Sequence, residues 1–402
     1  MSEHTQPNSA APQASGCQDR SEKEKPLVKP TNVIRFAGAF VAFMIGSGFA
    51  TGQEILQFFT AYGLWSIGGI FIAMVLFAWS GKTLMNYGYR HRGQTTEELA
   101  EGSFRYYAGK YFGLFLSWFI PLFLFLVVII MISGAGATIA QYFGAPTWVG
   151  SLGMAALIYI TNLFGFKRIV DVIGAIGPII IVFTIVIASF ALAINPTGLA
   201  NIGQHADVLA GIPNATQGAP LWMLAGALYV AYNATGSVPF FTQTGSIANS
   251  AREAKIGGIL GGILLMTAAL LLNLALLAYA PEVAALDVPN LYFAGLVSPL
   301  LSLLFAVIVL CGIFTTGAPM LWTATTRISM EDTPRYRITL TALTVLALIA
   351  GQLPYGTLMN IIYPYTGYIG IAFLALVALR QIIEWNNRRC GLPEETPLFK
   401  KK

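Results

Sequence analysis

The sequence predicts an all-α integral membrane protein with ten transmembrane helices. Of its 402 residues, 56% are hydrophobic and only 10% are charged, and the mean hydropathy is +0.67. A soluble domain carries about 25% charged residues. Apolar runs of about 20 residues recur along the chain, and a helix of that length crosses a hydrocarbon core about 30 Å thick. The short alternating segments typical of a transmembrane β-barrel do not recur.

Ten apolar segments carry this prediction, and we expect their boundaries to be accurate to about two to four residues. They cover residues 31–62, 64–86, 112–142, 147–165, 169–193, 219–249, 256–280, 290–320, 336–353 and 355–384. The chain then divides into a first five-helix half at 31–193, an extracytoplasmic loop at 194–218 and a second five-helix half at 219–384.

Basic residues set the predicted orientation. With ten spans, all 23 Lys and Arg residues fall on one side of the membrane. Positive residues remain cytoplasmic, so both termini are predicted to lie on the cytoplasmic side of the cell membrane. The net charge of +5 then reflects topology rather than nucleic-acid binding. The expected partners are the lipid bilayer and a small-molecule solute, and the sequence leaves open a monomer or a homodimer.

The chain ends and the rare residue types exclude other classes. Residues 1–30 are polar and predict a disordered cytoplasmic tail without the apolar core of a signal peptide. Residues 385–402 predict a second cytoplasmic tail. The chain has three Cys and three His, and no His lies in a predicted span. No metal-ligand cluster or catalytic constellation appears, so we expect no enzyme and no cofactor, apart from Na⁺ as a candidate coupling ion.

A short surface helix is predicted in the longest internal cytoplasmic loop, residues 93–110, GQTTEELAEGSFRYYAGK. Thr95 and Glu98 fit a helix capping box, in which each side chain bonds to the backbone amide of the other residue. The aromatic residues of this helix are expected to rest at the membrane interface.

Two predicted spans are interrupted by small and polar residues at matching depths. The first span is disturbed from Gly46 onward, within MIGSGFATGQEILQFF, residues 44–59. The sixth span is disturbed from Asn233 onward, within YVAYNATGSVPFF, residues 229–241. At 1.5 Å per residue, both disturbances begin roughly 20 Å along their helices. Irregular backbone is tolerated at that depth only where it is buried in protein or lines a cavity. We therefore predict two broken helices with a solute site between them.

The order of the two interrupted spans predicts an inverted repeat. The sixth span follows the first by an odd number of crossings, so the two halves have opposite orientations. Inverted halves that each open with an interrupted helix indicate a secondary transporter. Close helix packing is the alternative for the GxxxG at Gly48 and Gly52, but it leaves the polar run unexplained; for Gly257 and Gly261 we favour packing.

Glu54 supports two interpretations. Thr51-Gly-Gln-Glu54 fits the S/T-x-x-E capping box, so this glutamate could cap a helix that restarts after the break. An acid inside the membrane is also a functional candidate, here a proton carrier. The sequence leaves both open, and one residue can serve both.

The eighth span offers a candidate cation site in VLCGIFTTGAPM, residues 309–320. Thr315 and Thr316 are adjacent hydroxyls one turn beyond Gly312. Buried threonines commonly bond back to their own helix, which is the alternative to a ligand role. Beside a broken first span, these oxygens would suit a hard cation such as Na⁺.

MIGSGFATGQE also carries a family resemblance. The chain resembles transporters with the LeuT-type five-plus-five fold and is similar to the YkvI-like group, predicted amino-acid permeases of the amino acid–polyamine–organocation superfamily. The resemblance spans all ten segments. It implies a solute carboxylate bound by the amides of a glycine pair, matched here by Gly46 and Gly48 with Ser47 between them. It also implies a sodium site made of oxygens, matched by Ala42, Ile45, Gly312, Thr315 and Thr316.

Two departures from related patterns matter. Phe49 stands where sodium-coupled neurotransmitter-type members have an asparagine, so a second sodium site is not expected. No Lys or Arg lies deep in a span, whereas some proton-coupled relatives fill the cation site with a lysine. Glu54 is absent from the sodium-coupled pattern, which keeps proton coupling open.

The resulting prediction is a secondary active transporter that moves an amino acid or similar zwitterion, coupled to Na⁺ or H⁺ by alternating access. The predicted substrate site comprises Gly46, Ser47, Gly48, Tyr232, Asn233, Thr235, Gly236 and Ser237. The predicted cation or proton site comprises Ala42, Ile45, Gly312, Thr315, Thr316 and Glu54. A solute sensor built on a transporter fold is the alternative, although the tails are short for a signalling domain.

Overall fold

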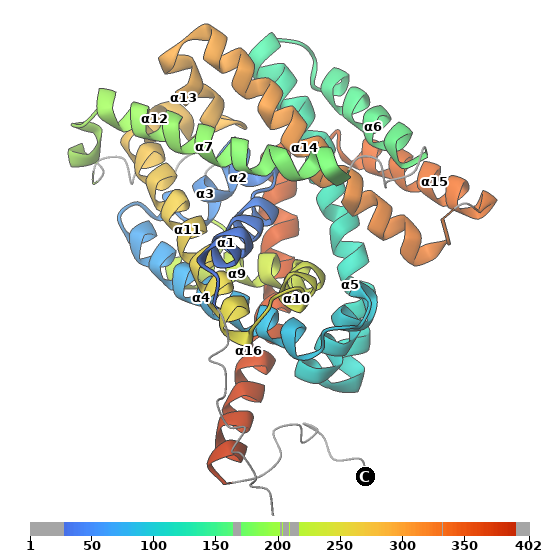
Figure 1. Cartoon of the computed structure of the whole chain (residues 1–402). Coiled ribbons are helices and arrows are strands. Elements are labelled where there is room, and N and C mark those ends of the chain that lie inside the picture. Colours follow the sequence, from blue (N-terminus) through green and yellow to red (C-terminus); the bar gives the residue numbers. More distant parts are fainter. Residues whose placement is uncertain are drawn as a thin grey trace, which may run out of the picture.

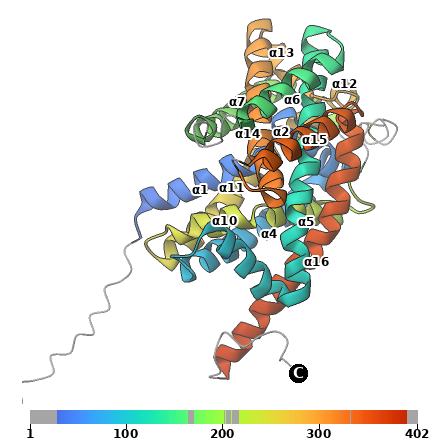
Figure 2. The same cartoon turned by 90° about the vertical axis from the view of Figure 1, so that its right-hand side faces the viewer.

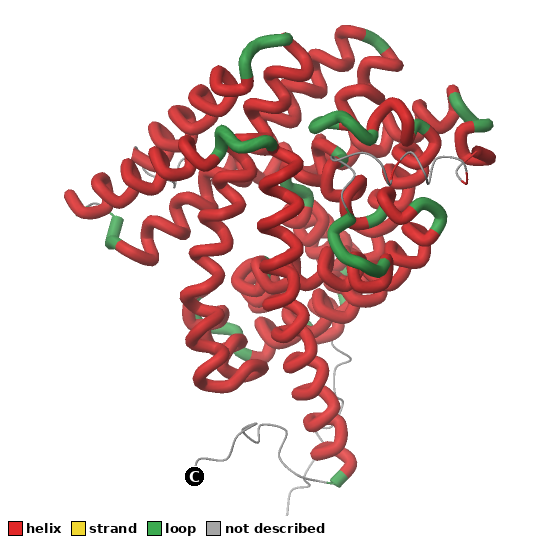
Figure 3. The backbone as a smooth tube through the Cα atoms, turned by 180° about the vertical axis from the view of Figure 1, so that it is seen from behind, coloured by secondary structure: helices red, strands yellow, loops and turns green. Residues whose placement is uncertain are grey.

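The computed structural model describes residues 28–163, 170–201, 203, 209, 217–331 and 333–390. The side chains of Ser47, of residues 170–178 and of Arg388 lie outside that description. The predictions for the tails at 1–30 and 385–402 and for the loop at 194–218 fall mostly outside the described residues. Within the described part, the backbone is helix and loop without a strand (Figure 3).

The helices follow one another in two series. The first series comprises α1 (Pro30–Met44), α2 (Ser47–Thr51), α3 (Gln53–Phe58), η1 (Thr60–Tyr62), α4 (Trp65–Arg90), α5 (Thr96–Phe143), α6 (Thr147–Leu163) and α7 (Val170–Ile194). After η3 (Gly198–Asn201), the second series comprises α9 (Trp222–Gly236), α10 (Val238–Ser246), α11 (Ala251–Ala278), α12 (Ala280–Val283), α13 (Pro289–Val297), α14 (Pro299–Ile328), α15 (Pro334–Ala350) and α16 (Tyr355–Arg389).

Among the residues that the structure describes, five helices, α4, α5, α11, α14 and α16, are long and apolar enough to cross a membrane. Helices α6 and α15 have 17 residues each, which is about 26 Å at 1.5 Å per residue. The predicted first and sixth spans are divided among shorter helices. Large apolar side chains lie exposed on the outside, as lipid-facing residues do; examples are Phe71, Val75, Leu122, Trp148 and Ile349. The chain is therefore a multi-pass membrane protein.

Glycines bring the helix backbones into contact. Helices α4 and α11 pack closely at Gly81 and Gly258, where a Cβ atom on Gly258 would lie 2.7 Å from the amide nitrogen of Lys82. Helix α11 also packs on α1: Cβ atoms at Gly257 and Gly261 would lie 2.7 and 2.6 Å from the Cβ atoms of Phe36 and Phe40. The packing interpretation of Gly257 and Gly261 is confirmed. Small residues at such crossings are what close helix association in a bilayer requires.

The predicted surface helix forms the first part of α5. The capping box is confirmed: the Thr95 amide donates to Glu98 Oε2 at 2.8 Å, and the Glu98 amide donates to Thr95 Oγ1 at 3.3 Å. These hydrogen bonds lower the pKa of Glu98. The backbone leaves the helical conformation at Gly109, with φ of 75°, and separates this part from the long apolar part of α5. Glycine adopts that conformation at no steric cost.

The short helices lie between longer ones (Figure 1). Helix α9 contacts both α4 and α16, α10 contacts α4 and α5, and α2 contacts α14. Figure 2 shows α5 and α16 running side by side, and the end of α16 extends beyond the other helices. This arrangement places the interruptions of the first and sixth predicted spans in the interior of the molecule.

Candidate functional site

The first predicted span consists of three helices. Helix α1 ends at Met44, and α2 begins at Ser47. The Gly46 amide donates to the Met44 carbonyl at 3.1 Å, whereas a continuous helix would pair it with Ala42. Ile45 and Gly46 have extended backbone conformations. The carbonyl of Ala42 is thereby released from its helical partner in the interior of the protein.

A second change of direction lies at Gly52, between α2 and α3. Its φ of 88° is strained for any residue with a Cβ atom. Asn290 of α13 covers this turn, because its amide nitrogen donates to the carbonyls of Phe49 at 3.2 Å and Ala50 at 2.9 Å. Carbonyls at a helix end need partners of this kind. Sequence reasoning missed Asn290, because it lies far along the chain and has no local motif.

The sixth predicted span divides at Ser237. Helix α9 ends at Gly236 and α10 begins at Val238, and Pro239 has no amide to continue the pattern. This boundary lies four residues after Asn233, where the disturbance was expected. The reason is local: the side chains of Asn233 and Thr235 donate back to carbonyls of α9, at 2.9 and 2.6 Å, and remain within the coil. The interruption is milder than in the first span, because the Ser237 amide still donates to the Asn233 carbonyl at 3.0 Å.

A cavity of about 60 Å³ lies where these helix ends meet. The predicted site residues that line it come from three predicted spans: Gly46, Glu54, Tyr232, Asn233, Gly236, Ser237 and Thr316. The remaining lining residues are aromatic, aliphatic or sulfur-containing: Phe43, Met44, Phe123, Leu124, Val127, Met131, Met320 and Tyr363. The structure thus gathers around one space residues that lie as far apart in the chain as Phe43 and Tyr363.

Other predicted substrate-site residues lie outside this lining. Gly48 is covered by the side chain of Glu54. The hydroxyl of Thr235 is engaged with the Ala231 carbonyl. The side chain of Ser47 lies outside the described part of the chain.

The predicted cation-site residues are only partly brought together. Thr316 lies beside the first interruption: a Cβ atom on Gly46 would lie 3.9 Å from the Thr316 methyl group. The Thr315 hydroxyl donates to the Gly312 carbonyl at 3.1 Å, and Gly312 packs against Ile180 of α7. Ala42, Ile45, Gly312 and Thr315 are not part of the cavity lining.

Glu54 lies in the first turn of α3 and is 4% exposed. The capping-box interpretation of Thr51 and Glu54 is wrong, because α3 begins after Gly52 without a side-chain cap. The carboxyl group of Glu54 instead forms hydrogen bonds with the hydroxyls of Tyr229 and Tyr363. The ring of Tyr363 stacks on Tyr232, with centroids 4.5 Å apart.

Glu54 also sets the electrostatics of the cavity. Among the described residues that line it, Glu54 is the only one with a charged side chain. A buried carboxylate is costly unless an opposite charge or hydrogen bonds compensate it. The cavity is therefore suited to a positively charged group, such as an ammonium, a metal cation or a proton on the carboxylate itself.

Long apolar helices around a buried, acid-lined cavity define a multi-pass helical membrane protein. The chain is 25% identical over 350 residues to the uncharacterized membrane protein YkvI of Bacillus subtilis (strain 168), covering 86% of this chain and 95% of that protein. It is 24% identical over 345 residues to the uncharacterized protein YyaD of the same organism, covering 85% and 94%. The resemblance to YkvI expected from the sequence is thus confirmed. No protein-family model matches the chain.

Solved structures of transporters share its fold. A manganese transporter of Eremococcus coleocola aligns with a TM-score of 0.52 and 13% identity, over 84% of this chain and 76% of that chain. MhsT in complex with L-phenylalanine aligns with a TM-score of 0.52 and 15% identity, over 90% of each chain. At these identities the likeness establishes the fold, and both of these structures are transporters rather than enzymes.

Proposed function

We propose that this protein is a secondary active transporter for an amino acid or a similar small zwitterion, coupled to Na⁺ or H⁺. Fold alone does not give function, so the site must carry the argument. The observation that carries it is the cavity that Gly46, Ser237 and Thr316 line together with the buried acid Glu54. Interrupted helices that meet around a polar point inside a membrane protein are the form that transporter sites take.

The proposed architecture is the LeuT-type inverted repeat of five plus five spans. One repeat contains α1–α3, α4, α5, α6 and α7, and the other contains α9–α10, α11, α14, α15 and α16. Each repeat opens with a divided helix, which supports an inverted relationship. The distribution of basic residues favours both termini inside, and the likeness to YkvI of Bacillus subtilis favours the cytoplasmic membrane of a bacterium.

The two ends of the solute would bind different groups. The carboxylate would accept hydrogen bonds from the backbone at Gly46, Ser47 and Gly48 once the Gly46 amide leaves the Met44 carbonyl and the Glu54 side chain moves off Gly48. The ammonium would face Glu54 and the aromatic rings. The cavity of about 60 Å³ is much smaller than the ~300 Å³ or more of typical small-molecule sites. The solute is therefore small, and the cavity widens during the cycle, as conformational closure around substrates implies.

The coupling ion has two candidate sites. The carbonyls of Ala42 and Ile45, with the oxygens of Gly312, Thr315 and Thr316, would hold Na⁺, and the released Ala42 carbonyl supports this choice. Glu54 would carry H⁺ instead, and its burial beside the first interruption supports that role. Each site predicts a different ion requirement, and the two requirements can be measured separately.

Alternating access would arise from movement of one group of helices against the rest. The glycine contacts make α1, α4 and α11 one closely packed group. The two interruptions also touch, since the Ser237 hydroxyl lies 3.7 Å from the Met44 sulfur. A movement of this group past α5, α14 and α16 would open the cavity to one side or the other.

Counterflow in proteoliposomes tests the proposal. Proteoliposomes that contain the purified protein are loaded with one unlabelled solute. Uptake of the same solute in labelled form is then followed under separate sodium and proton gradients. The panel contains amino acids, including L-phenylalanine, zwitterionic osmolytes and Mn²⁺. Exchange of a zwitterion supports the proposal, exchange of Mn²⁺ alone replaces the solute class, and binding without exchange indicates a sensor.

A further inference from the structure

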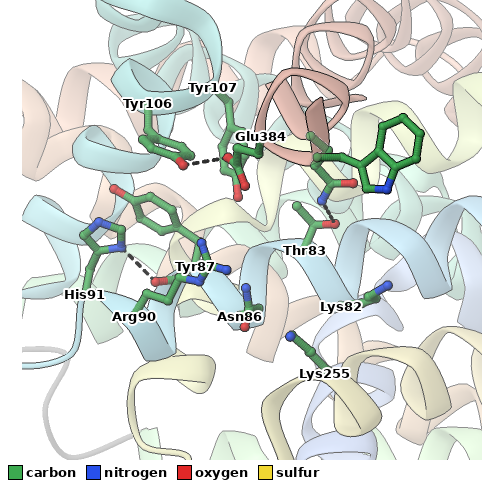
Figure 4. A pocket seen from close by; sticks show the side chains of 12 residues that line it. Lys82, Thr83, Asn86, Tyr87, Arg90, His91, Tyr106, Tyr107, Lys255 and Glu384 are labelled. Carbon is green, nitrogen blue, oxygen red and sulfur yellow. Dashed lines mark hydrogen bonds between the residues drawn. The ribbon is translucent and has the colours of Figure 1, made fainter. Parts of the chain in front are cut away.

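Two further cavities lie apart from the central one. The first, of about 280 Å³, opens between the ends of α4, α5, α11 and α16, and most of its lining is polar or charged (Figure 4). The second, of about 320 Å³, lies between α5, α6 and α14, and we call it the outer groove. The described linings of the three cavities share no residue, so the outer groove is a separate feature of the molecule.

The described lining of the outer groove is apolar throughout. Its side chains are aliphatic, aromatic or sulfur-containing, and they include Val149 and Leu157 of α6 and Val307 and Phe314 of α14. None of these groups is charged or forms a strong hydrogen bond. A polar ligand group would give up its hydrogen bonds with water there and gain none in return. The outer groove therefore suits a hydrocarbon.

Helix contacts at both ends hold the outer groove open. Gly150 of α6 touches the backbone of α5, where a Cβ atom on Gly150 would lie 2.9 Å from the Cα atom of Gly136. Further along α6, Ile158 packs on α14, since a Cβ atom on Gly317 would lie 2.8 Å from its Cδ1 atom. Gly153 lies between these contacts, and beyond its own helix backbone no atom of the described residues lies within 4 Å of a Cβ atom there. The outer groove is therefore a fixed gap between packed helices.

The outer groove lies in the central part of two helices and is continuous with the lipid-facing surface. Its lining extends from Val149 to Leu157 on α6 and from Val307 to Phe314 on α14. At 1.5 Å per residue these stretches are about 10–12 Å long. Val149, Leu157 and Val307 are also exposed on the apolar outside of the molecule. At this depth the protein is surrounded by the hydrocarbon of the bilayer, so neither water nor a soluble partner reaches the outer groove.

We propose that the outer groove binds one acyl chain of a membrane phospholipid. The chain lies between α6 and α14 and passes over Gly153, where no side chain fills the space. An empty gap deprives its lining of van der Waals partners, and apolar cavities bind apolar molecules for this reason. Binding depends on the chain and not on the headgroup, because the described lining offers no charged group.

The bound chain would also support the helix that carries part of the central site. Cys311 and Phe314 line the outer groove, whereas Thr316 lines the central cavity from another face of α14. A ligand that binds only the folded arrangement stabilises it by its binding free energy. The acyl chain would therefore hold α14 in position from the lipid side.

Photolabelling in proteoliposomes tests the proposal. The bilayer contains a phosphatidylcholine with a diazirine in the middle of one acyl chain, and labelled peptides are identified by mass spectrometry after irradiation and digestion. Gly153→Phe fills the outer groove, and Ile349→Phe adds the same ring to the lipid-facing surface of α15 as a matched control. Labelling of residues 307–314 should fall at least about tenfold in Gly153→Phe and should not change in Ile349→Phe.

Two further measurements make the result specific. Gly153→Leu is a smaller replacement, and it should reduce labelling of residues 307–314 less than Gly153→Phe does. A phosphatidylglycerol with the same diazirine chain should label the outer groove as strongly as the phosphatidylcholine does. Labelling spread evenly over all lipid-facing helices and unaffected by Gly153→Phe would indicate ordinary contact with bulk lipid and would overturn the proposal.

A second copy of this chain is the competing occupant. Cys311 lines the outer groove, so two copies that meet there could be joined by a bismaleimide in a variant with Cys17→Ser and Cys390→Ser. Absence of such a dimer, together with lipid labelling, supports an acyl chain. A cross-linked dimer that Cys311→Ser abolishes would assign the outer groove to an interface between copies and would overturn the proposal. Neither measurement depends on transport.

Discussion

The side chain of Glu54 lies directly over the backbone of Gly48. A Cβ atom at position 48 would overlap the carboxyl group and the Cγ atom of Glu54. Glycine at this position therefore makes room for Glu54, whose side chain is the only charged one among the described residues that line the central cavity. The turn at Gly52 creates this contact, because it brings the start of α3 against α2.

Gly48→Ala should displace the carboxyl group of Glu54. Overpacking of this kind costs about 1–3 kcal/mol of stability and moves neighbouring atoms. We expect uptake to fall at least about tenfold. The measurement is initial uptake in proteoliposomes at equal protein density, with the unfolding temperature measured in parallel.

Gly38→Ala is the matched control, because no atom of the described residues beyond the neighbouring helix backbone lies within 4 Å of a Cβ atom at that position. This variant should transport normally, and its helix should become slightly more stable. Normal uptake by Gly48→Ala would show that Glu54 tolerates displacement and has no part in the transport cycle.

Glu54→Gln should flatten the pH dependence of uptake if Glu54 carries the coupling proton. Glutamine keeps the shape and the hydrogen bonds with Tyr229 and Tyr363 but has no titratable group. The measurement is the ratio of uptake rates between about pH 6 and about pH 8 at saturating solute. An unaltered ratio together with a higher KM would instead assign Glu54 to binding of the solute ammonium.

Thr316→Ala should abolish sodium stimulation if the cation site uses this hydroxyl. Loss of one oxygen ligand should raise the half-saturating sodium concentration by at least about tenfold, so that sodium no longer stimulates uptake at the concentrations that act on the wild type. Thr323→Ala is the control, because Thr323 lies on the same helix and donates to the Pro319 carbonyl at 2.9 Å. Equal sodium dependence in both variants and in the wild type would remove the proposed site.

Thr95→Ala should loosen the start of α5. The variant loses the bond between the Thr95 hydroxyl and the Glu98 amide, and loss of such a cap costs about 1 kcal/mol. Amide hydrogen exchange in the first turn should become about fivefold faster. Exchange in the long apolar part of α5, beyond Gly109, should not change, and equal acceleration there would contradict a local role.

The capping box also predicts a pH dependence. Its hydrogen bonds lower the folded-state pKa of Glu98 below the ordinary value of 4.5. The stabilisation is therefore fully present above pH 4.5 and is lost as the pH falls through the lower folded-state value. The protection factors of the amides at residues 96–100, which compare each exchange rate with the intrinsic rate at the same pH, should fall on acidification in the wild type, and Glu98→Gln should remove this dependence.

Local patterns in the sequence determined much of the outcome. Runs of apolar residues predicted the helices, because a backbone inside a bilayer must satisfy its own hydrogen bonds. The capping box at Thr95 and Glu98 and the close packing at Gly257 and Gly261 were also predictable, because each pattern consists of residues three or four positions apart in the sequence. The glycines and polar residues at 46–52 pointed to a departure from regular helix for the same reason.

The tertiary structure decided which of these residues meet. The side chain of Glu54 turns to Tyr229 and Tyr363 instead of capping a helix, because Gly52 redirects the chain and α9 and α16 supply the hydroxyls. Asn290 holds the end of α2 from the other half of the molecule. The pattern along one helix depends on steps of a few residues, whereas these contacts depend on how distant helices pack, so no local pattern contains them.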